Sequence, residues 1–441
     1  MLSREDNDRL TQTGPDTPCG GLMRAYWQPA ALVSELRDER PVTPVRLLGE
    51  DLVLFRKPDG GHGLIGRYCA HRGVDLAYGR LEECGLRCLY HGWLYGPDGR
   101  CLEQPAEPAH SRFHEKIRHV SYPCRERNGI VFAYMGGGDP PPFPDYDCFV
   151  APDAYTFAFK GLWECNWLQG VEGGIDPSHV SFLHRFINED PRETYGQQFA
   201  ERVEGTDITL SELVGANPRP DIEVETTEYG LRVFAIRELN EETRHVRITN
   251  LMFPNAFVVP FGNSKVFAQW HVPIDDENHF WYMILYDFAE ETDKDTLLRQ
   301  RLDSCTLPDY RPVRNRGNDW GFDPREQNEL TYTGMGLDIN VHDQWAVESM
   351  GRIQDRTKER LGVSDRAVTA NRRMLLRAIS DHGAGKVTPG MATGEAQARA
   401  LTGPLAVDMI APASDWQDRW RGREARRRSA SPWAAGSHAA V

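Results

Sequence analysis

The chain has 441 residues, of which 40% are hydrophobic, and its formal net charge at pH 7 is −14. This length predicts two or three domains, and the acidic balance argues against nucleic acid as the main partner. No apolar run approaches the roughly 18 residues of a membrane helix, and the polar N-terminal stretch predicts no signal peptide. Nine cysteines scattered over a long chain favour metal-bound thiolates in a reducing cytoplasm over a disulfide scaffold.

The first part of the chain reads as a lead-in segment followed by a small all-β domain. Residues 1–35 predict a short helix at most, and residues 40–135 alternate short strands with turns such as "GPDG". The glycine- and proline-rich stretch "MGGGDPPPFPDYD" is typical of a linker. We therefore expect one domain over residues 1–143 and a second over residues 144–441.

The second part predicts an α+β domain. Residues 160–186 read as helical, residues 206–290 as strands of an antiparallel sheet with one buried face, and residues 341–380 as helical again. The arginine-rich stretch from residue 415 onward predicts a solvated, partly disordered tail. The expected fold is an all-β domain followed by an α+β domain.

Two cysteine–histidine pairs in the all-β part have the spacing of a metal centre. They are Cys69 and His71 in "CAHRG", and Cys88 and His91 in "CLYHGW". Ordinary zinc sites combine a pair of cysteines with a pair of histidines, whereas each pair here contains one cysteine and one histidine. That mixture suits a Rieske [2Fe–2S] cluster, in which two thiolates hold one iron and two imidazoles hold the other. A structural zinc site is the alternative interpretation of the same four residues.

Two further histidines lie in the stretch "GIDPSHVSFLHRF". With a carboxylate from elsewhere in the chain, His179 and His184 complete the two-histidine, one-carboxylate set of non-haem iron(II) oxygenases, which leaves positions open for dioxygen. Their offset is not a clean helical face, because five steps along a helix turn about 500°. A helix distortion, or a break near Ser181, is needed to bring both imidazoles to one ion.

Asp176 precedes His179 by three residues, on the same face of a helix. Its carboxylate can accept the free ring N–H of His179 and so fix the tautomer of that ligand. The alternative is that Asp176 caps a helix whose first residue is Pro177. That alternative does not explain why two histidines lie on the apolar side of the segment.

These stretches resemble the α-subunit of Rieske non-haem iron ring-hydroxylating oxygenases, and among them the phthalate 4,5-dioxygenase group. The resemblance rests on "CAHRGVDLAYGRLE", "CLYHGW", "NWLQGVEGGIDPSHVSFLH", "FPNAFVVP", "HVPIDDE" and "TYTGMGLDINVHDQWAVESMGRIQDRTKERLGVSD". It implies a β-sandwich Rieske domain followed by a helix-grip catalytic domain, in which an antiparallel sheet wraps a long C-terminal helix. It also implies a [2Fe–2S] cluster, a mononuclear Fe(II), and O2 as co-substrate.

The resemblance places the third iron ligand in "INVHDQWAVES". Asp343 holds the position of the family's aspartate, and Glu348 is the nearby alternative. His342 is a neighbouring competitor, although a third histidine departs from the family pattern. Asp338 and Asp355 are expected to cap or decorate helices.

The resemblance also implies an assembly and a supply of electrons. In a homotrimer or hexamer, Asp176 would bridge His91 of a neighbouring subunit to His179. Electrons would come from an NAD(P)H reductase that contains flavin and a plant-type [2Fe–2S] centre. The substrate would be a small aromatic compound, most often an aromatic acid.

An aromatic acid calls for an arginine in the pocket. "RHVRITN" offers Arg244 and Arg247, whose offset of three places them on opposite faces of a strand, so that at most one points inward. We favour Arg247, with Arg202 and Arg237 as further candidates. A solvated or structural ion pair is the alternative for each. Ser178 is a candidate donor to a substrate carboxylate.

Two other functions remain open from the sequence. Pro177 removes a hydrogen-bond donor beside Ser178, which argues against phthalate itself as the substrate. The same chemistry would serve an O- or N-demethylase, in which hydroxylation of a methyl group releases formaldehyde. A zinc-stabilised binding protein without redox activity is the alternative from another class.

Overall fold

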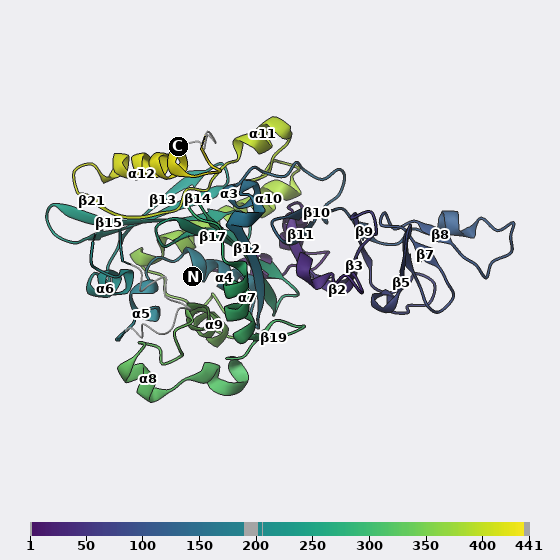
Figure 1. Ribbon diagram of the computed structural model, residues 1–441, viewed down its shortest axis with the longest axis horizontal. Helices are drawn as coiled ribbons and strands as arrows, with labels where there is room; N and C mark the ends of the chain where they lie inside the picture. The colour runs from purple at the N-terminus through teal and green to yellow at the C-terminus, as the bar shows by residue number, and fades with distance from the viewer. Residues whose placement is uncertain (1, 189–201, 205, 436–441) are drawn as a thin grey trace.

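The chain folds into a projection made of small sheets and a larger body built on one broad sheet (Figure 1). This computed structural model describes residues 2–188, 202–204 and 206–435. The projection contains two four-stranded antiparallel sheets, and some of their buried side chains form a separate core between them, while others join the main core. The strands of one sheet are, in spatial order, β2 (Val42–Leu47), β3 (Glu50–Arg56), β4 (His62–Gly66) and β9 (Ser121–Tyr122). Those of the other are β5 (Arg80–Glu82), β6 (Gly85–Arg87), β7 (Leu94–Tyr95) and β8 (Cys101–Glu103).

A third small sheet connects the projection to the body. Its strands are β1 (Gln28–Leu32), β11 (Ile130–Ala133) and β10 (Cys124–Arg127). Both β1 and β11 contribute side chains to the main hydrophobic core. The N-terminal helices α1 (Arg4–Thr11) and α2 (Pro18–Arg24) pack against helix α10 of the body. The predicted boundary after residue 143 stays a prediction.

The body is built on an antiparallel sheet of eight strands. Strand β15 is long enough to pair with two strands on one side, β21 along its first half and β16 along its second. The spatial order is β12 (Thr156–Trp163), β18 (His279–Asp287), β17 (Lys265–Pro273), β16 (Ala256–Phe261), β15 (Thr243–Met252), β14 (Gly230–Glu238) and β13 (Asp221–Thr227), with β21 (Val407–Pro412) beside β15.

Helices cover the sheet and position the site. Helix α4 (Trp167–Ile175) contacts β15, β16 and β17, and α9 (Ile339–Ser349) packs on α4. The long helix α10 (Arg366–Gly383) buries Val368, Leu375 and Ile379, as the periodicity predicted. The expected order of an all-β domain and an α+β domain is confirmed. The remaining helices and short strands are α3 (Asp147–Val150), α5 (Val180–Leu183), α6 (Leu210–Ala216), α7 (Lys294–Asp303), β19 (Cys305–Thr306), β20 (Arg311–Pro312), α8 (Pro324–Glu329), α11 (Glu395–Ala400) and α12 (Trp416–Ala430).

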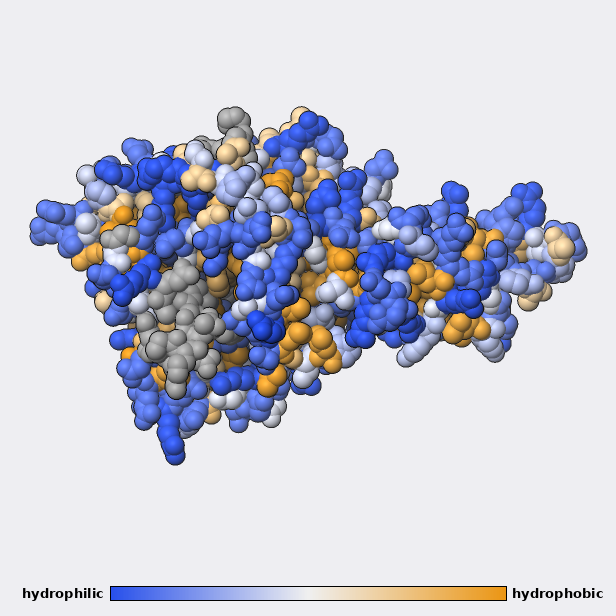
Figure 2. Space-filling model, viewed as in Figure 1, coloured by the Kyte–Doolittle hydropathy of each residue, from blue (hydrophilic) through white to orange (hydrophobic). Residues whose placement is uncertain are grey.

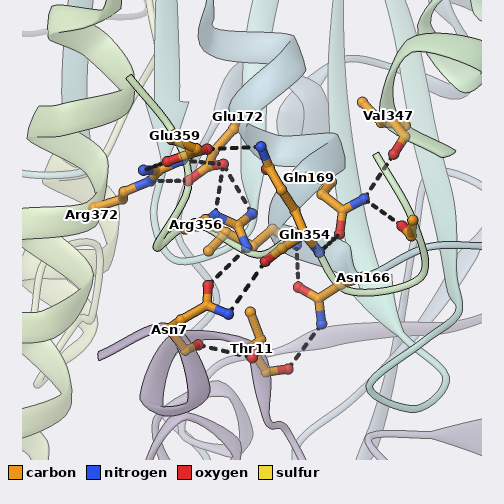
Figure 3. Close-up of polar contacts among 12 residues, drawn as sticks. Asn7, Thr11, Asn166, Gln169, Glu172, Val347, Gln354, Arg356, Glu359 and Arg372 are labelled. Atoms are coloured by element: carbon orange, nitrogen blue, oxygen red, sulfur yellow. Dashed lines mark hydrogen bonds and ion pairs between the residues drawn. The ribbon is translucent and has the colours of Figure 1, made fainter. Parts of the chain in front are cut away.

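A buried ionic network anchors helix α4 to α1 and α10 (Figure 3). Glu172 of α4 accepts hydrogen bonds from Arg356, at 3.0 Å, and from Arg372 of α10, at 2.6 Å. Arg372 also donates to Glu359 at 2.9 Å, and Arg356 donates to Asn7 of α1 at 3.4 Å. Two arginines and two glutamates balance in charge, so the network joins α1, α4 and α10 without a net buried charge.

The prediction of one helix over residues 160–186 is wrong in two ways. Its first residues form a strand, and the helical part is divided into two helices, α4 and α5. Residues up to Trp163 form β12, and α4 begins only at Trp167. The spacing of four between these tryptophans imitates a helical face, although one ends a strand and the other begins a helix. Both tryptophans are buried. Most residues of β12 are buried as well, and in such a strand the periodicity of apolar residues does not distinguish strand from helix.

The prediction of a partly disordered C-terminal tail is also wrong for most of the residues concerned. Residues from Trp416 onward form α12, and Trp416 and Trp420 pack with side chains of β14, β15 and β21. Arg428 is buried and donates to Asp147 at 3.0 Å. The arginines therefore cover apolar surface with their stems and pair with buried carboxylates. Residues 436–441 of the predicted tail lie outside the described residues.

The surface and the cysteines agree with the bulk composition. Figure 2 shows hydrophilic side chains over most of the visible face, with hydrophobic ones gathered on parts of the projection and of the body. Within the described ranges, no helix has both the length and the apolar character needed to cross a membrane. All nine cysteines are described, and none of them forms a disulfide.

Candidate active site

The two cysteine–histidine pairs lie on two loops of the same construction in the projection. In each loop the cysteine carbonyl accepts a hydrogen bond from the amide of a following glycine, Gly73 to Cys69 at 2.8 Å and Gly92 to Cys88 at 3.0 Å. The two glycines have φ angles of +73° and +75°, in the left-handed region that favours glycine. The repeated turn places the four predicted ligands at one end of the projection.

The cysteines of these loops lie inside and the histidines outside. Cys69 and Cys88 are each 3% exposed, and the Tyr95 hydroxyl lies 3.2 Å from the Cys69 sulfur. The rings of His71 and His91 meet edge to face, with centroids 4.5 Å apart. In the described part of the chain, the buried Nδ1 of His91 has no hydrogen-bond partner. An orphaned imidazole nitrogen beside buried thiols fits a cluster held by two sulfurs and two nitrogens.

In the body, His179, His184 and Asp343 come together. His179 Nε2 lies 3.2 Å from His184 Nε2 and 3.7 Å from an Asp343 oxygen, and His184 Nε2 lies 3.2 Å from that oxygen. Ligand bonds of about 2.1 Å at right angles place donors about 3.0 Å apart, so the three atoms fit one metal ion. The two histidines flank the single turn α5, and the chain leaves helical geometry at His184 rather than near Ser181.

Burial sets the protonation of these three groups. It lowers the pKa of His179, and it lowers that of His184 to about 3. It raises the pKa of the Asp343 carboxyl to about 6. The imidazoles are therefore neutral, which is the form that binds a metal. A cation at the centre of the three would favour the ionised form of Asp343.

His342 lies behind His184 and not at the centre of the three groups. Its Nε2 donates to the Gly336 carbonyl at 2.7 Å, so its Nδ1 is left to accept. That atom lies 3.4 Å from His184 Nδ1, which orients the Nε2 of His184 toward Asp343. Glu348 is turned away, because its carboxylate accepts from the Glu164 amide at 2.8 Å and from the Trp320 indole at 2.8 Å.

Asp176 lies beside His179 at the end of α4. One carboxylate oxygen accepts the Ser178 amide at 2.7 Å, and the other lies 3.9 Å from His179 Nδ1. The alternative in which Asp176 begins a helix at Pro177 is wrong, because Asp176 follows the last residue of α4 instead. Arg237 is fully buried and donates to the Pro177 carbonyl at 3.0 Å, which holds the turn in place.

A cavity that opens to solvent lies against the three predicted iron ligands. Phe257, Val259 and Phe267 of the sheet give it apolar walls. On the opposite side, a Cβ atom at Gly170 would collide with the His271 ring, and one at Gly174 would collide with Phe257. These glycines let α4 approach the sheet closely. Apolar walls with a few polar side chains are typical of a small-molecule site.

Comparisons with known proteins agree with this construction. Residues 26–121 match the family described as Rieske [2Fe-2S] domain, and residues 133–431 match the one described as LigXa C-terminal domain like. The chain is 36% identical over 413 residues to the phthalate 4,5-dioxygenase oxygenase subunit of Pseudomonas putida, with 90% of each chain covered. The chain belongs to the Rieske oxygenase family.

Two further relatives broaden the comparison. The 5,5'-dehydrodivanillate O-demethylase oxygenase subunit of Sphingobium sp. (strain NBRC 103272 / SYK-6) is 32% identical over 386 residues, covering 86% of this chain and 80% of that one. The oxygenase in the reduced oxygenase–ferredoxin complex of carbazole 1,9a-dioxygenase has the same fold, with a TM-score of 0.56 at 20% identity over 88% of this chain and 98% of that one.

As a Rieske oxygenase, the protein is an oxidoreductase of the aromatic ring-hydroxylating type. Its cofactors are a [2Fe–2S] cluster and a mononuclear iron, and it uses O2. The zinc interpretation of the two cysteine–histidine pairs is thereby replaced.

Only one of the predicted substrate residues of this Rieske oxygenase lines the cavity within the described part of the chain, and it is Arg247. It forms an ion pair with Asp408 of β21 and donates to the Pro260 carbonyl at 3.0 Å. Burial alone would raise the pKa of Asp408, but His245 and Arg247 hold it well below its usual range. The arginine is therefore fixed in orientation by its neighbours.

The other substrate candidates lie elsewhere. Arg244 donates to the Asn240 carbonyl at 2.6 Å, on the opposite side of β15 from Arg247. Arg202 is exposed and pairs with Asp207 at 2.6 Å. Arg237 supports the Asp176 turn, and Ser178 is not part of the cavity lining among described residues.

Sequence reasoning missed several polar residues of the cavity wall. Thr249, Gln269, His271 and Asn340 all line it. A signal for two of them was present, because Phe267, Gln269 and His271 alternate along β17 and must share one face.

Replacing His342 with alanine is expected to weaken iron binding about ten- to a hundredfold, because His184 loses the group that orients its ring. The measurement is iron content per chain after dialysis against graded chelator, with the cluster absorbance as internal reference. A glutamine at this position can still accept from His184 and donate to Gly336, so it should restore binding. Equal iron retention in the alanine variant and the parent would contradict the role.

Proposed function

We propose that this chain is the terminal oxygenase component of an enzyme that hydroxylates a small aromatic carboxylate. The observation that carries the proposal is the meeting of His179, His184 and Asp343 at the wall of a largely apolar cavity. We assign these three side chains as the iron ligands. We assign the cluster to the two paired loops, with the ligands Cys69, His71, Cys88 and His91.

When bound, the cluster supplies electrons singly and the iron supplies the place where O2 reacts. The side chains of the protein do the rest. Phe257, Val259 and Phe267 hold an aromatic ring by apolar contact and keep water away from it. His179, His184 and Asp343 would hold the metal at the cavity wall, so that a ring held by the apolar side chains would lie near the metal without being bonded to it.

Arg247 is the proposed anchor for the substrate carboxylate. Its guanidinium lines the cavity and is held by Asp408 and the Pro260 carbonyl. Because Asp408 already balances the charge, the carboxylate would be held by directed hydrogen bonds rather than by net charge. A single arginine anchor suits a monocarboxylate better than phthalate, in agreement with the proline at position 177.

Asp176 is the proposed bridge between two copies of the chain. Figure 1 shows the strands β5 and β7 in the outer part of the projection, whereas α5 and α9 lie in the body. We infer that electrons reach the iron from another copy of the chain. In a homotrimer or hexamer, a cluster histidine of the neighbour, His91, would face Asp176 and through it His179.

The proposed electron supply is an NAD(P)H reductase with flavin and a [2Fe–2S] centre, in a reducing cytoplasm. Beside the cluster loops, Leu89 and Tyr90 are 65% and 54% exposed, which offers an apolar contact surface to another protein. The carbazole 1,9a-dioxygenase neighbour was solved together with a ferredoxin.

A second candidate function is O- or N-demethylation. It is favoured by the 32% identity to an O-demethylase subunit over 86% of this chain. The same cavity would then hold a methoxy or N-methyl carbon, and not a ring carbon, next to the metal.

The deciding experiment is incubation of the purified protein and a surrogate reductase with a panel of aromatic acids, methoxy compounds and N-methyl compounds. We expect substrate-dependent NADH use and a product that gains one or two oxygen atoms with an aromatic acid. A product that has only lost a methyl group would establish the demethylase instead. NADH use that depends on none of the aromatic compounds would contradict both.

Replacing Asp343 with alanine is expected to remove the mononuclear iron while leaving the cluster in place. The two histidines alone provide two of the three ligands, and loss of a ligand typically abolishes retention. Iron and sulfide analysis checks the outcome, with a fall in iron but not in acid-labile sulfide. A matched Glu348→Ala variant should keep its iron, because that carboxylate is turned away.

A further inference from the structure

A line of buried polar groups runs from the cavity wall into the sheet. Gln269 and His271 lie two residues apart on β17, and His279 begins β18, with exposed fractions of 4%, 0% and 0%. Gln269 Nε2 lies 3.2 Å from His271 Nε2, and His271 Nδ1 lies 2.9 Å from His279 Nε2. The line ends where His279 Nδ1 meets the Cys165 carbonyl at 2.7 Å.

The Cys165 carbonyl at the end of the line fixes the direction of every hydrogen bond in it. A carbonyl only accepts, so His279 Nδ1 carries the hydrogen and its Nε2 must accept. His271 Nδ1 therefore donates, which leaves His271 Nε2 as an acceptor. The group of Gln269 that faces it must then be the amide NH2. The orientation of the glutamine amide follows from this chain of constraints.

Both rings are neutral, as this direction requires. Burial lowers the pKa of His279 to about 4 and holds that of His271 well below its usual value. Trp163 and Phe257 flank the His271 ring, with centroids 5.3 and 5.6 Å away. The rings cannot turn freely in this packing, so the line stays fixed.

The other atom of the amide, the carbonyl oxygen Oε1, is the one left for the cavity. Gln269 lines the cavity together with the predicted iron ligands, and no described residue donates a hydrogen bond to Oε1. We infer that Gln269 is a substrate-positioning acceptor, and that the preferred substrate carries a hydroxyl or N–H group that donates to Oε1.

This inference rests on the proposed function and makes its substrate class narrower. A carboxylate has only acceptor atoms when ionised, so Oε1 repels it and directs it to Arg247. The ring is then held by two different groups, an acid at Arg247 and a donor at Gln269. A neutral hydrogen bond whose loss leaves a buried acceptor unpaired is worth about tenfold in affinity or more.

The test is calorimetric binding of monohydroxybenzoates to the oxidised, metal-loaded protein without reductant, so that no turnover occurs. Each isomer is compared with the fluorobenzoate substituted at the same carbon, which lacks the donor. We expect at least one hydroxybenzoate to bind about tenfold more tightly than its fluoro counterpart. Gln269→Leu should remove this preference. His279→Phe, which alters the line outside the cavity, should reduce it.

Gln417→Leu is the matched control, because Gln417 is an exposed glutamine of α12 that does not line the cavity. Equal affinities within every pair in the parent protein would overturn the inference. So would a preference that survives Gln269→Leu or that disappears with Gln417→Leu. In those cases oxidation of aromatic acids would still support the proposed function. If no benzoate binds and no aromatic compound is oxidised, both proposals fail.

Discussion

Replacing Asp176 with asparagine is expected to lower turnover by about a hundredfold or more while both metal centres stay loaded. Asparagine keeps the oxygen that accepts the Ser178 amide, so the turn after α4 is retained. What it removes is the negative charge 3.9 Å from the His179 ring. In the proposed assembly, a proton on a histidine of the neighbouring cluster would then have no ionised group to receive or balance it.

Steady-state NADH use, iron content and the cluster spectrum together check this expectation. Asp355→Asn is a matched control, because Asp355 accepts the Thr357 amide in a turn of the same kind away from the iron ligands. Near-normal turnover in Asp176→Asn would refute the bridging role. Loss of iron would instead show that Asp176 serves mainly to hold the ligand His179.

Replacing Glu172 with glutamine is expected to destabilise the fold by about 3–5 kcal/mol, because buried Arg356 then loses its carboxylate partner and Arg372 keeps only Glu359. Glu172, Arg356 and Arg372 are 7%, 0% and 4% exposed, so water cannot replace the lost charge. The network anchors α4, whose end carries Asp176. Thermal unfolding of the loaded protein should therefore show a clear fall in Tm, and iron should be lost more easily.

The dependence on pH gives a second check. Burial acts to raise the pKa of Glu172, yet Arg356 and Arg372 hold it below its usual value. Its stabilising effect is therefore present above the unfolded pKa of about 4.3 and is lost as the pH falls through the folded value. The difference in Tm between parent and variant should shrink below about pH 4. In the exposed pair of Arg112 and Glu115, Glu115→Gln should leave Tm unchanged.

The proposed metal ligands are the part of the site most accessible from sequence. Cys69, His71, Cys88 and His91 lie in two short stretches whose spacing alone indicates a cluster, and His179 and His184 lie in one. Their coordination chemistry is carried by residue type and local turns, which sequence displays directly. The aspartate, about 160 residues away, needed a family resemblance.

What sequence could not predict depends on contacts between distant strands and helices. Nothing local shows that His342 lies behind His184, or that Asp408 balances the charge of Arg247. The direction of the Gln269 amide depends on a carbonyl more than a hundred residues earlier. Such properties arise only when the sheet and helices have come together.

The mistakes in secondary structure have the same origin. The strand that ends at Trp163 is buried on both sides, so its apolar run has no clear period. The C-terminal helix is rich in arginine, and its place on the sheet depends on Trp420 and on the pairing of Arg428 with Asp147. The many arginines make such a helix look solvent-exposed from its composition, although one of its faces packs on the sheet.

The close approach of α4 to the sheet limits how this cavity can be remodelled. At Gly170 and Gly174 even a methyl group would displace His271 or Phe257, so the helical wall cannot supply new side chains. A changed substrate range must come from other parts of the lining, such as the strands that carry Thr249, Val259 and Phe267 or the helix α9 that carries Asn340. Libraries for altering specificity should avoid Gly170 and Gly174, since diversity at these positions of α4 would mostly yield unfolded or iron-free protein.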